Sequence, residues 1–155
     1  MGLFSRKNKN AKKLDKVFSA VCATFNDLQD NNFQMEPMLL LPILHGISAS
    51  YITMIYQNPE SLLQRYDEIF NDKLCDMDIS PEYRMKLLQI SNGAYCTSCE
   101  TAQKVVATNK NIQIDQLFVI SASQTLCEAV GADAPDTILD MKMLSLYYYL
   151  NEAMS

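Results

Sequence analysis

The uncharged stretch from Pro37 to Pro59 constrains the fold of this chain most. It reads PMLLLPILHGISASYITMIYQNP and contains no Asp, Glu, Lys or Arg. Such a stretch is either the central buried helix of a soluble helical domain or a marginal membrane span. A span needs about 20 predominantly apolar residues, whereas this stretch includes Pro42, His45, Gly46, Ser48, Ser50, Thr53 and Gln57. The sequence therefore favours a central helix onto which the other helices pack.

Apolar residues recur with helical spacing through most of the remaining chain. In residues 11–29 they lie on one helical face, and they are Leu14, Val17, Phe18, Val21, Phe25 and Leu28. The sequences Asn-Pro-Glu at 58–60 and Ser-Pro-Glu at 80–82 are typical of helix starts. Asn-Gly at 92–93 and Gly131 are typical of helix ends. These signals predict helices from Pro59 to a turn at 76–80, from Pro81 to 92–93, from about Thr97 to Thr108 and from about 113 to 130, with a last helix opening at 133–136.

The whole pattern predicts an all-α protein. No stretch shows the sustained alternation of a half-buried strand, and 155 residues correspond to one domain. We expect a single compact, bundle-like domain of six to seven helices over residues 11–155, with a central apolar helix. Residues 1–10 are expected to form a flexible basic tail.

Charge is distributed unevenly along the chain. Residues 1–16 contain six Lys or Arg and one Asp, whereas the rest contains 7 basic and 17 acidic residues. An acidic body repels nucleic-acid phosphates, so we predict no nucleic-acid binding. The basic segment could touch an anionic membrane surface or an acidic partner, and a plain disordered terminus is the alternative.

The cysteines indicate a reducing compartment. There are five, an odd number, and no apolar signal-peptide segment follows MGLFSRKNKN. Free thiols are typical of cytoplasmic proteins, so we expect a cytoplasmic location.

Cys96 and Cys99 form a CxxC motif. If a helix begins at about Thr97, both thiols lie on the same side of a helix start, where N–H groups and the helix dipole stabilise a thiolate. Cys96 is then the candidate attacking thiol and Cys99 the resolving thiol. Two alternatives remain, a structural pair of half-buried residues and zinc binding. A closed zinc site needs four ligands, and with one histidine and no second CxxC we predict no metal site.

Residues 80–103, SPEYRMKLLQISNGAYCTSCETAQ, resemble the core of the AhpD and carboxymuconolactone decarboxylase-like proteins. The closing segment LYYYLNEA at 146–153 also resembles the last helix of some members. The resemblance implies an all-α fold with a helix, a turn and a CxxC at the next helix start, and it implies thiol or peroxide chemistry at Cys96 and Cys99. Two positions depart from the family pattern, because Gln103 stands where the family has His and Arg84 where it has Glu.

Two further sets of residues are candidates for binding. His45 is the only histidine and lies in the uncharged stretch, where it serves as a base or ligand, or as a hydrogen-bonded core residue. Tyr147, Tyr148 and Tyr149 point in three directions from the last helix, so at least one ring points away from its apolar stripe and is a candidate contact surface. The alternative is that all three pack beneath neighbouring segments. There is no GxGxxG or GxxxxGK[ST] motif, and we predict no cofactor.

These features favour a small cytosolic protein that acts through protein–protein contact, as an adaptor, chaperone-like or regulatory subunit, with a homo-oligomer among the options. The acidic body, nine Met, eight Tyr and few catalytic residue types support it. The alternative is an AhpD-like thiol–disulfide or peroxide-reducing protein that uses Cys96 and Cys99. An enzyme is not the favoured interpretation; if the protein is one, we expect a thiol-dependent oxidoreductase.

Overall fold

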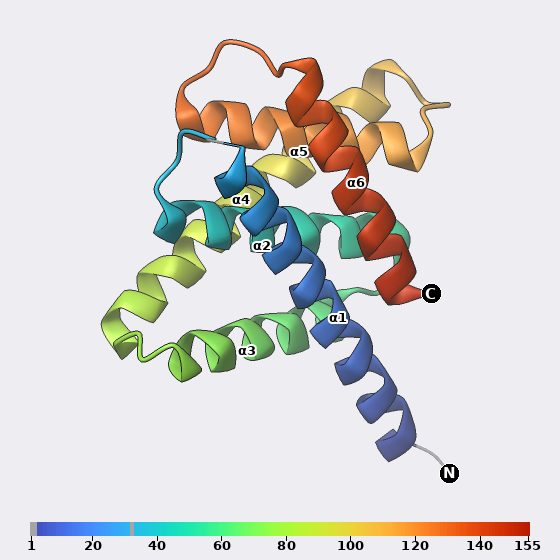
Figure 1. Cartoon of the computed structure of the whole chain (residues 1–155). Coiled ribbons are helices and arrows are strands. Elements are labelled where there is room, and N and C mark those ends of the chain that lie inside the picture. The colour runs from blue at the N-terminus through green and yellow to red at the C-terminus, as the bar shows by residue number, and fades with distance from the viewer. Residues whose placement is uncertain (1–2, 32) are drawn as a thin grey trace.

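The computed structural model describes the backbone of residues 3–31 and 33–155, and their side chains from Asn8 onward. Within this part the chain forms six helices and no strand (Figure 1). They are α1 (Leu3–Asp30), α2 (Pro37–Ile55), α3 (Glu60–Asp76), α4 (Pro81–Thr108), α5 (Ile114–Val130) and α6 (Thr137–Met154). The prediction of an all-α fold with a central apolar helix is confirmed.

The uncharged stretch forms α2, which lies at the centre and contacts every other helix. Every residue from Leu40 to Ile52 is buried. Of the described helices, α2 alone has the length and apolar composition of a membrane span, but 72% of its most apolar window is buried inside the protein. Helix α2 is therefore the core that the other helices cover.

Pro42 lies within α2 without ending the helix. Helix α2 begins at Pro37, five residues before it. A proline interrupts the backbone hydrogen bond to the residue four positions earlier. Because Pro42 is close to the N-terminus of α2, only the first turn loses a bond, and packing on all sides keeps the helix continuous.

Helices α2 and α4 cross at Gly46. A Cβ atom at Gly46 would lie 2.2 Å from the carbonyl oxygen of Ser91, 2.8 Å from the amide nitrogen of Tyr95 and 2.9 Å from Cβ of Ala94. Two helix backbones approach this closely only where one of them lacks a side chain. Gly46 therefore fixes the point at which α4 crosses the central helix.

Helix α4 runs unbroken for 28 residues, from Pro81 to Thr108. Our prediction of two helices separated at 92–93 is wrong. Gly93 is exposed and has helical geometry, while the buried side chains Leu87, Ser91, Ala94, Ser98 and Ala102 continue as one stripe past it. Packing of this stripe outweighs the roughly 1 kcal/mol that an interior glycine costs a helix.

Helices α1 and α6 lie side by side, and the first turns of α1 extend beyond the other helices (Figure 1). Lys142 pairs with Asp27 at 2.7 Å, and Nζ of Lys13 donates to the carbonyl oxygen of Met154 at 3.3 Å. We predicted a helix only from about Ala11, but α1 begins at Leu3. The segment is rich in good helix formers and lacks Pro and Gly between Leu3 and Asp30, so nothing in it ends the helix.

Candidate functional site

His45 lies in the core, sandwiched between two aromatic rings. Its ring is stacked on those of Tyr66 and Phe70, with centroids 4.1 Å apart in both pairs. The side chain is fully buried. Helix α2 supplies the histidine and α3 supplies both rings, so the packing of these two helices holds the imidazole in one orientation.

The two ring nitrogens of His45 face polar side chains from two other helices. Nδ1 lies 2.6 Å from Oγ of Ser91 on α4, a hydrogen bond between two buried side chains. Nε2 lies 3.8 Å from Oδ1 of Asp67 on α3 and has no hydrogen-bond partner among the described residues. The fold thus assembles Ser91, His45 and Asp67 in a row, with the histidine in the middle.

A cavity of about 280 Å³ opens beside this row. Asp67 and Ser91 line it together with Asn92 and Tyr95, and its apolar wall consists of Ala49, Leu63 and Leu88. Sequence analysis singled out His45 but neither Ser91 nor Asp67. The three residues lie far apart in the sequence and share no motif, so only the packing of α2, α3 and α4 brings them together.

Burial controls the protonation of this cluster. It lowers the pKa of His45 from 6.5 to about 3, and the backbone carbonyl of Tyr66 offsets part of that effect. Burial also raises the pKa of the Asp67 carboxyl above its usual value. A desolvated group favours its uncharged form, so His45 is neutral at pH 7.

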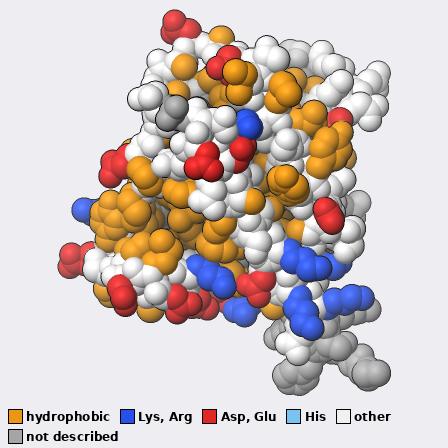
Figure 2. Space-filling view, in the orientation of Figure 1, with side chains coloured by type: hydrophobic (Ala, Val, Ile, Leu, Met, Phe, Trp, Pro, Cys, Tyr) orange, Lys and Arg blue, Asp and Glu red, His pale blue; other side chains and the backbone are white. Residues whose placement is uncertain are grey.

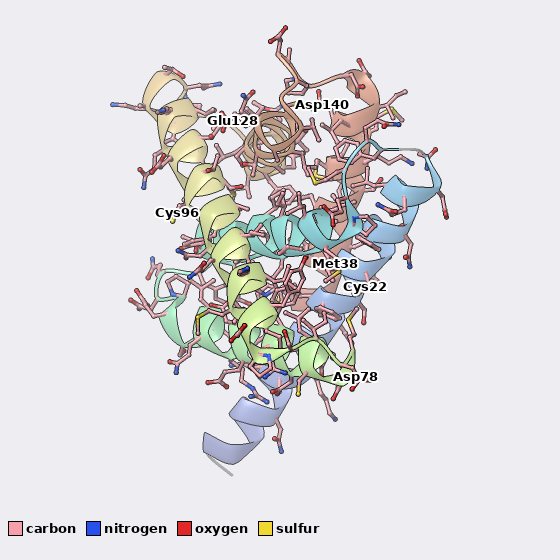
Figure 3. All side chains as sticks on the ribbon, turned by 90° about the vertical axis from the view of Figure 1, so that its left-hand side faces the viewer. Cys22, Met38, Asp78, Cys96, Glu128 and Asp140 are labelled. Carbon is pink, nitrogen blue, oxygen red and sulfur yellow. The ribbon has the colours of Figure 1, made fainter. Side chains whose placement is uncertain are left out.

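The CxxC motif lies in the middle of α4, not at a helix start. The expected stabilisation of a Cys96 thiolate by free N–H groups is therefore wrong, because the amides there are already bonded within the helix. Cys96 is exposed, and Figure 3 shows it on the outer side of α4. The turn that the AhpD resemblance implied before the motif is helical in this structure.

Cys99 is half-buried and lines a groove between α2 and α4. Burial raises the pKa of the Cys99 thiol, and a hydrogen bond from Tyr95 opposes that effect. The Tyr95 hydroxyl also lies 2.9 Å from Oγ1 of Thr53, which lines the same groove. The groove has a volume of about 550 Å³ and mostly apolar walls, among them Met54, Ala102, Val106 and Ala107. His45 does not line it.

The three tyrosines of α6 have different environments. Tyr147 packs edge-on against Tyr51 and tilted against Phe118, with centroids 5.7 and 5.8 Å apart. Tyr148 and Tyr149 remain 56% and 52% exposed. The structure therefore places one tyrosine against the core and leaves the other two accessible to a partner.

Two more exposed apolar side chains lie on α6, Ile138 at 65% and Met141 at 63%. Sequence analysis did not single them out, although their spacing from Tyr148 gave the signal. Positions 138, 141 and 148 fall on one helical face, opposite the buried stripe of Leu139, Met143, Leu146 and Leu150. We call Ile138, Met141 and Tyr148 the α6 ridge.

Comparison of the chain with family models, with curated proteins and with solved structures found no significant match. Among the described residues, no group of three or more His, Cys, Asp or Glu side chains is arranged to hold a metal ion.

Proposed function

We propose that this is a small cytosolic helical protein that acts through protein–protein contact, as an adaptor, chaperone-like or regulatory subunit, and that the α6 ridge carries the contact. The observation that carries the proposal is that α6 is apolar on two opposite faces. Leu139, Met143, Leu146 and Leu150 are buried against the body, while the ridge faces solvent.

A helix at the surface of a soluble domain normally has one apolar stripe and a polar outer face. Helices that are apolar on both sides are buried on both sides. Figure 2 shows hydrophobic side chains exposed over α6 on the face toward the viewer. An outer stripe of Ile, Met and Tyr is thus expected to be covered when the protein functions.

The chemistry of the ridge fits a protein partner. Tyr and Met are enriched at the buried centres of protein interfaces, where an aromatic ring provides a large contact area and its hydroxyl a hydrogen bond. Ser145 and Glu152 are exposed on the same helical face and offer polar groups beside the apolar side chains. Met is flexible enough to fit different partner surfaces, which agrees with an adaptor or chaperone-like role.

The alternative, an AhpD-like thiol–disulfide or peroxide-reducing protein, would use Cys96 and Cys99. Such chemistry requires a thiolate, and a thiol is activated by a helix N-terminus or a nearby positive charge. The motif lies mid-helix and burial raises the pKa of Cys99. These observations favour the ridge over the CxxC as the functional site.

Affinity capture with paired variants tests the proposal. Met141→Glu with Tyr148→Glu places two charges on the ridge, and Met85→Glu with Tyr83→Glu makes the same changes on α4. Met85 is also 63% exposed and Tyr83 41% exposed, so both pairs lie at accessible positions. We expect the ridge variant to lose recovered partners, or self-association, at least about tenfold, while the α4 variant retains them, because charged groups in an interface core are strongly unfavourable. Equal recovery with both variants would show that the contact lies elsewhere.

A further inference from the structure

We propose that Ser91, His45 and Asp67 form a reactive-serine site that accepts short-chain acyl esters. This activity is separate from the proposed contact function, because the three residues lie on α4, α2 and α3 and not on α6. The inference rests on the row of three polar side chains and on the cavity that Ser91 and Asp67 line.

The row has the order that nucleophilic serine chemistry requires. An activated nucleophile lies within hydrogen-bond reach of a base, and a third group orients the base. Oγ of Ser91 is 2.6 Å from Nδ1 of His45, and Oδ1 of Asp67 is 3.8 Å from Nε2 on the other side of the ring. The Asp67 side chain is 61% exposed, so it can approach Nε2 more closely. In the established Ser-His-Asp arrangement Nε2 faces the serine, so here the two ring nitrogens exchange roles.

The tautomer follows from the contacts. When the Ser91 hydroxyl donates to Nδ1, the ring proton is on Nε2 and points toward the Asp67 carboxylate. The stacked rings of Tyr66 and Phe70 prevent the imidazole from turning away. Nε2 is buried and makes no hydrogen bond among the described residues. The backbone carbonyl of Tyr66 acts on the ring, and Asp67 provides the carboxylate that faces Nε2, at 3.8 Å.

The cavity determines the substrate class. Its volume of about 280 Å³ is just below the range of typical small-molecule sites, which begins at about 300 Å³. Its walls are apolar at Ala49, Leu63 and Leu88, and Asn92 contributes an amide that can donate to a carbonyl oxygen. A short acyl group fits this space.

The step that we infer is an acyl transfer followed by hydrolysis. Oγ of Ser91 bonds to the carbonyl carbon of the ester while its proton passes to Nδ1 of His45. The bond from that carbon to the leaving oxygen then breaks, and His45 returns the proton to the leaving alcohol. Water cleaves the acyl–serine by the same proton path, so the products are an alcohol and a carboxylic acid.

The experiment uses the full chain and a small alkyl fluorophosphonate as the probe. In this reaction Oγ of Ser91 bonds to phosphorus, and fluoride leaves with the serine proton. Intact mass and peptide mapping locate the adduct. Asp67→Asn removes the orienting carboxylate, and Glu68→Gln makes the same change at a neighbouring side chain that pairs with Arg65 instead.

We expect one adduct, on Ser91, formed at equal rates in the wild type and in the Glu68→Gln variant. Labelling of Asp67→Asn should be at least about tenfold slower, because the orienting carboxylate contributes more than that in established sites. Absence of an adduct on Ser91, an adduct only at another residue, or equal rates for the two variants would each overturn the proposal. Both substitutions lie at exposed positions, and circular dichroism checks that the variants are folded.

Discussion

His45 is the residue whose chemistry the fold alters most. In the unfolded chain it is an ordinary histidine, whereas in the folded protein it is buried between two rings with a pKa of about 3. The sequence left open whether it is a core residue or a base. The structure shows that it is a core residue whose Nδ1 is hydrogen-bonded to Ser91, and also that it occupies the middle of the polar row with Ser91 and Asp67.

The lowered pKa of His45 predicts that the protein loses stability in mild acid. Above pH 6.5 His45 is neutral in both the folded and the unfolded chain, and its contribution to the free energy of unfolding is fully present. Below pH 6.5 the unfolded chain takes up a proton that the folded protein does not bind until about pH 3. The free energy of unfolding from urea titrations should therefore fall by about 1.4 kcal/mol between pH 7.5 and pH 5.5.

His45→Gln provides the control, because His45 is the only histidine of the chain. That variant is less stable at pH 7.5 but should show little further loss at pH 5.5, since carboxyl groups titrate mainly at lower pH. A wild-type free energy of unfolding that is the same at both pH values would contradict the burial argument.

The burial of Cys99 predicts that its thiol is alkylated slowly. Cys99 is half-buried, and burial raises the pKa of its thiol. The thiolate is the species that reacts with alkylating agents. At pH 7.5 iodoacetamide should modify the exposed Cys75 and Cys96 before Cys99. Peptide mapping of a time course measures the order, and modification of Cys99 first would refute the prediction.

At the scale of the element, the helices were largely predictable and two boundaries were not. The start at Pro81, capped by Ser80, and the end at the left-handed Gly131 followed from local signals that the structure retains. Helix α3 also begins where it was predicted, at 59–60, but without a side-chain cap. The predicted break at Gly93 was wrong because a glycine stop signal is local, whereas the stripe from Leu87 to Ala102 packs over the whole length of α4. The predicted N-terminal boundary of α1 was wrong because the basic residues near the N-terminus indicate a solvated segment, and a solvated segment can still be helical.

Gly46 and Gly93 make a matched test of this interpretation. Gly46→Ala places a methyl group against the backbone of α4 and should lower the free energy of unfolding by at least about 2 kcal/mol, because overpacking forces the backbones apart. Gly93→Ala meets no neighbouring atom within 4 Å and should raise it by roughly 0.5–1 kcal/mol, the helix-propensity difference. Urea titration measures both, and changes of the same sign would contradict the crossing at Gly46.

At the scale of the whole molecule, the sequence predicted the architecture better than the sites. An uncharged helix surrounded by amphipathic ones leads to a bundle around α2, since each apolar stripe needs a common partner. The row of Ser91, His45 and Asp67 could not be predicted, because it depends on how three helices cross. The α6 ridge was partly predictable: three consecutive tyrosines require an outward ring, but the roles of Ile138 and Met141 depend on which face of α6 is buried.

The most direct test of the contact function places a photo-crosslinking amino acid at Tyr148 and, in a separate control, at Tyr83 on α4. Both side chains are exposed, at 56% and 41%, so solvent access is similar. Irradiation of cells that produce the full chain should give covalent adducts of defined higher mass from position 148 and none from position 83. Adducts from both positions alike, or from neither, would contradict the claim that the outer face of α6 is the binding surface.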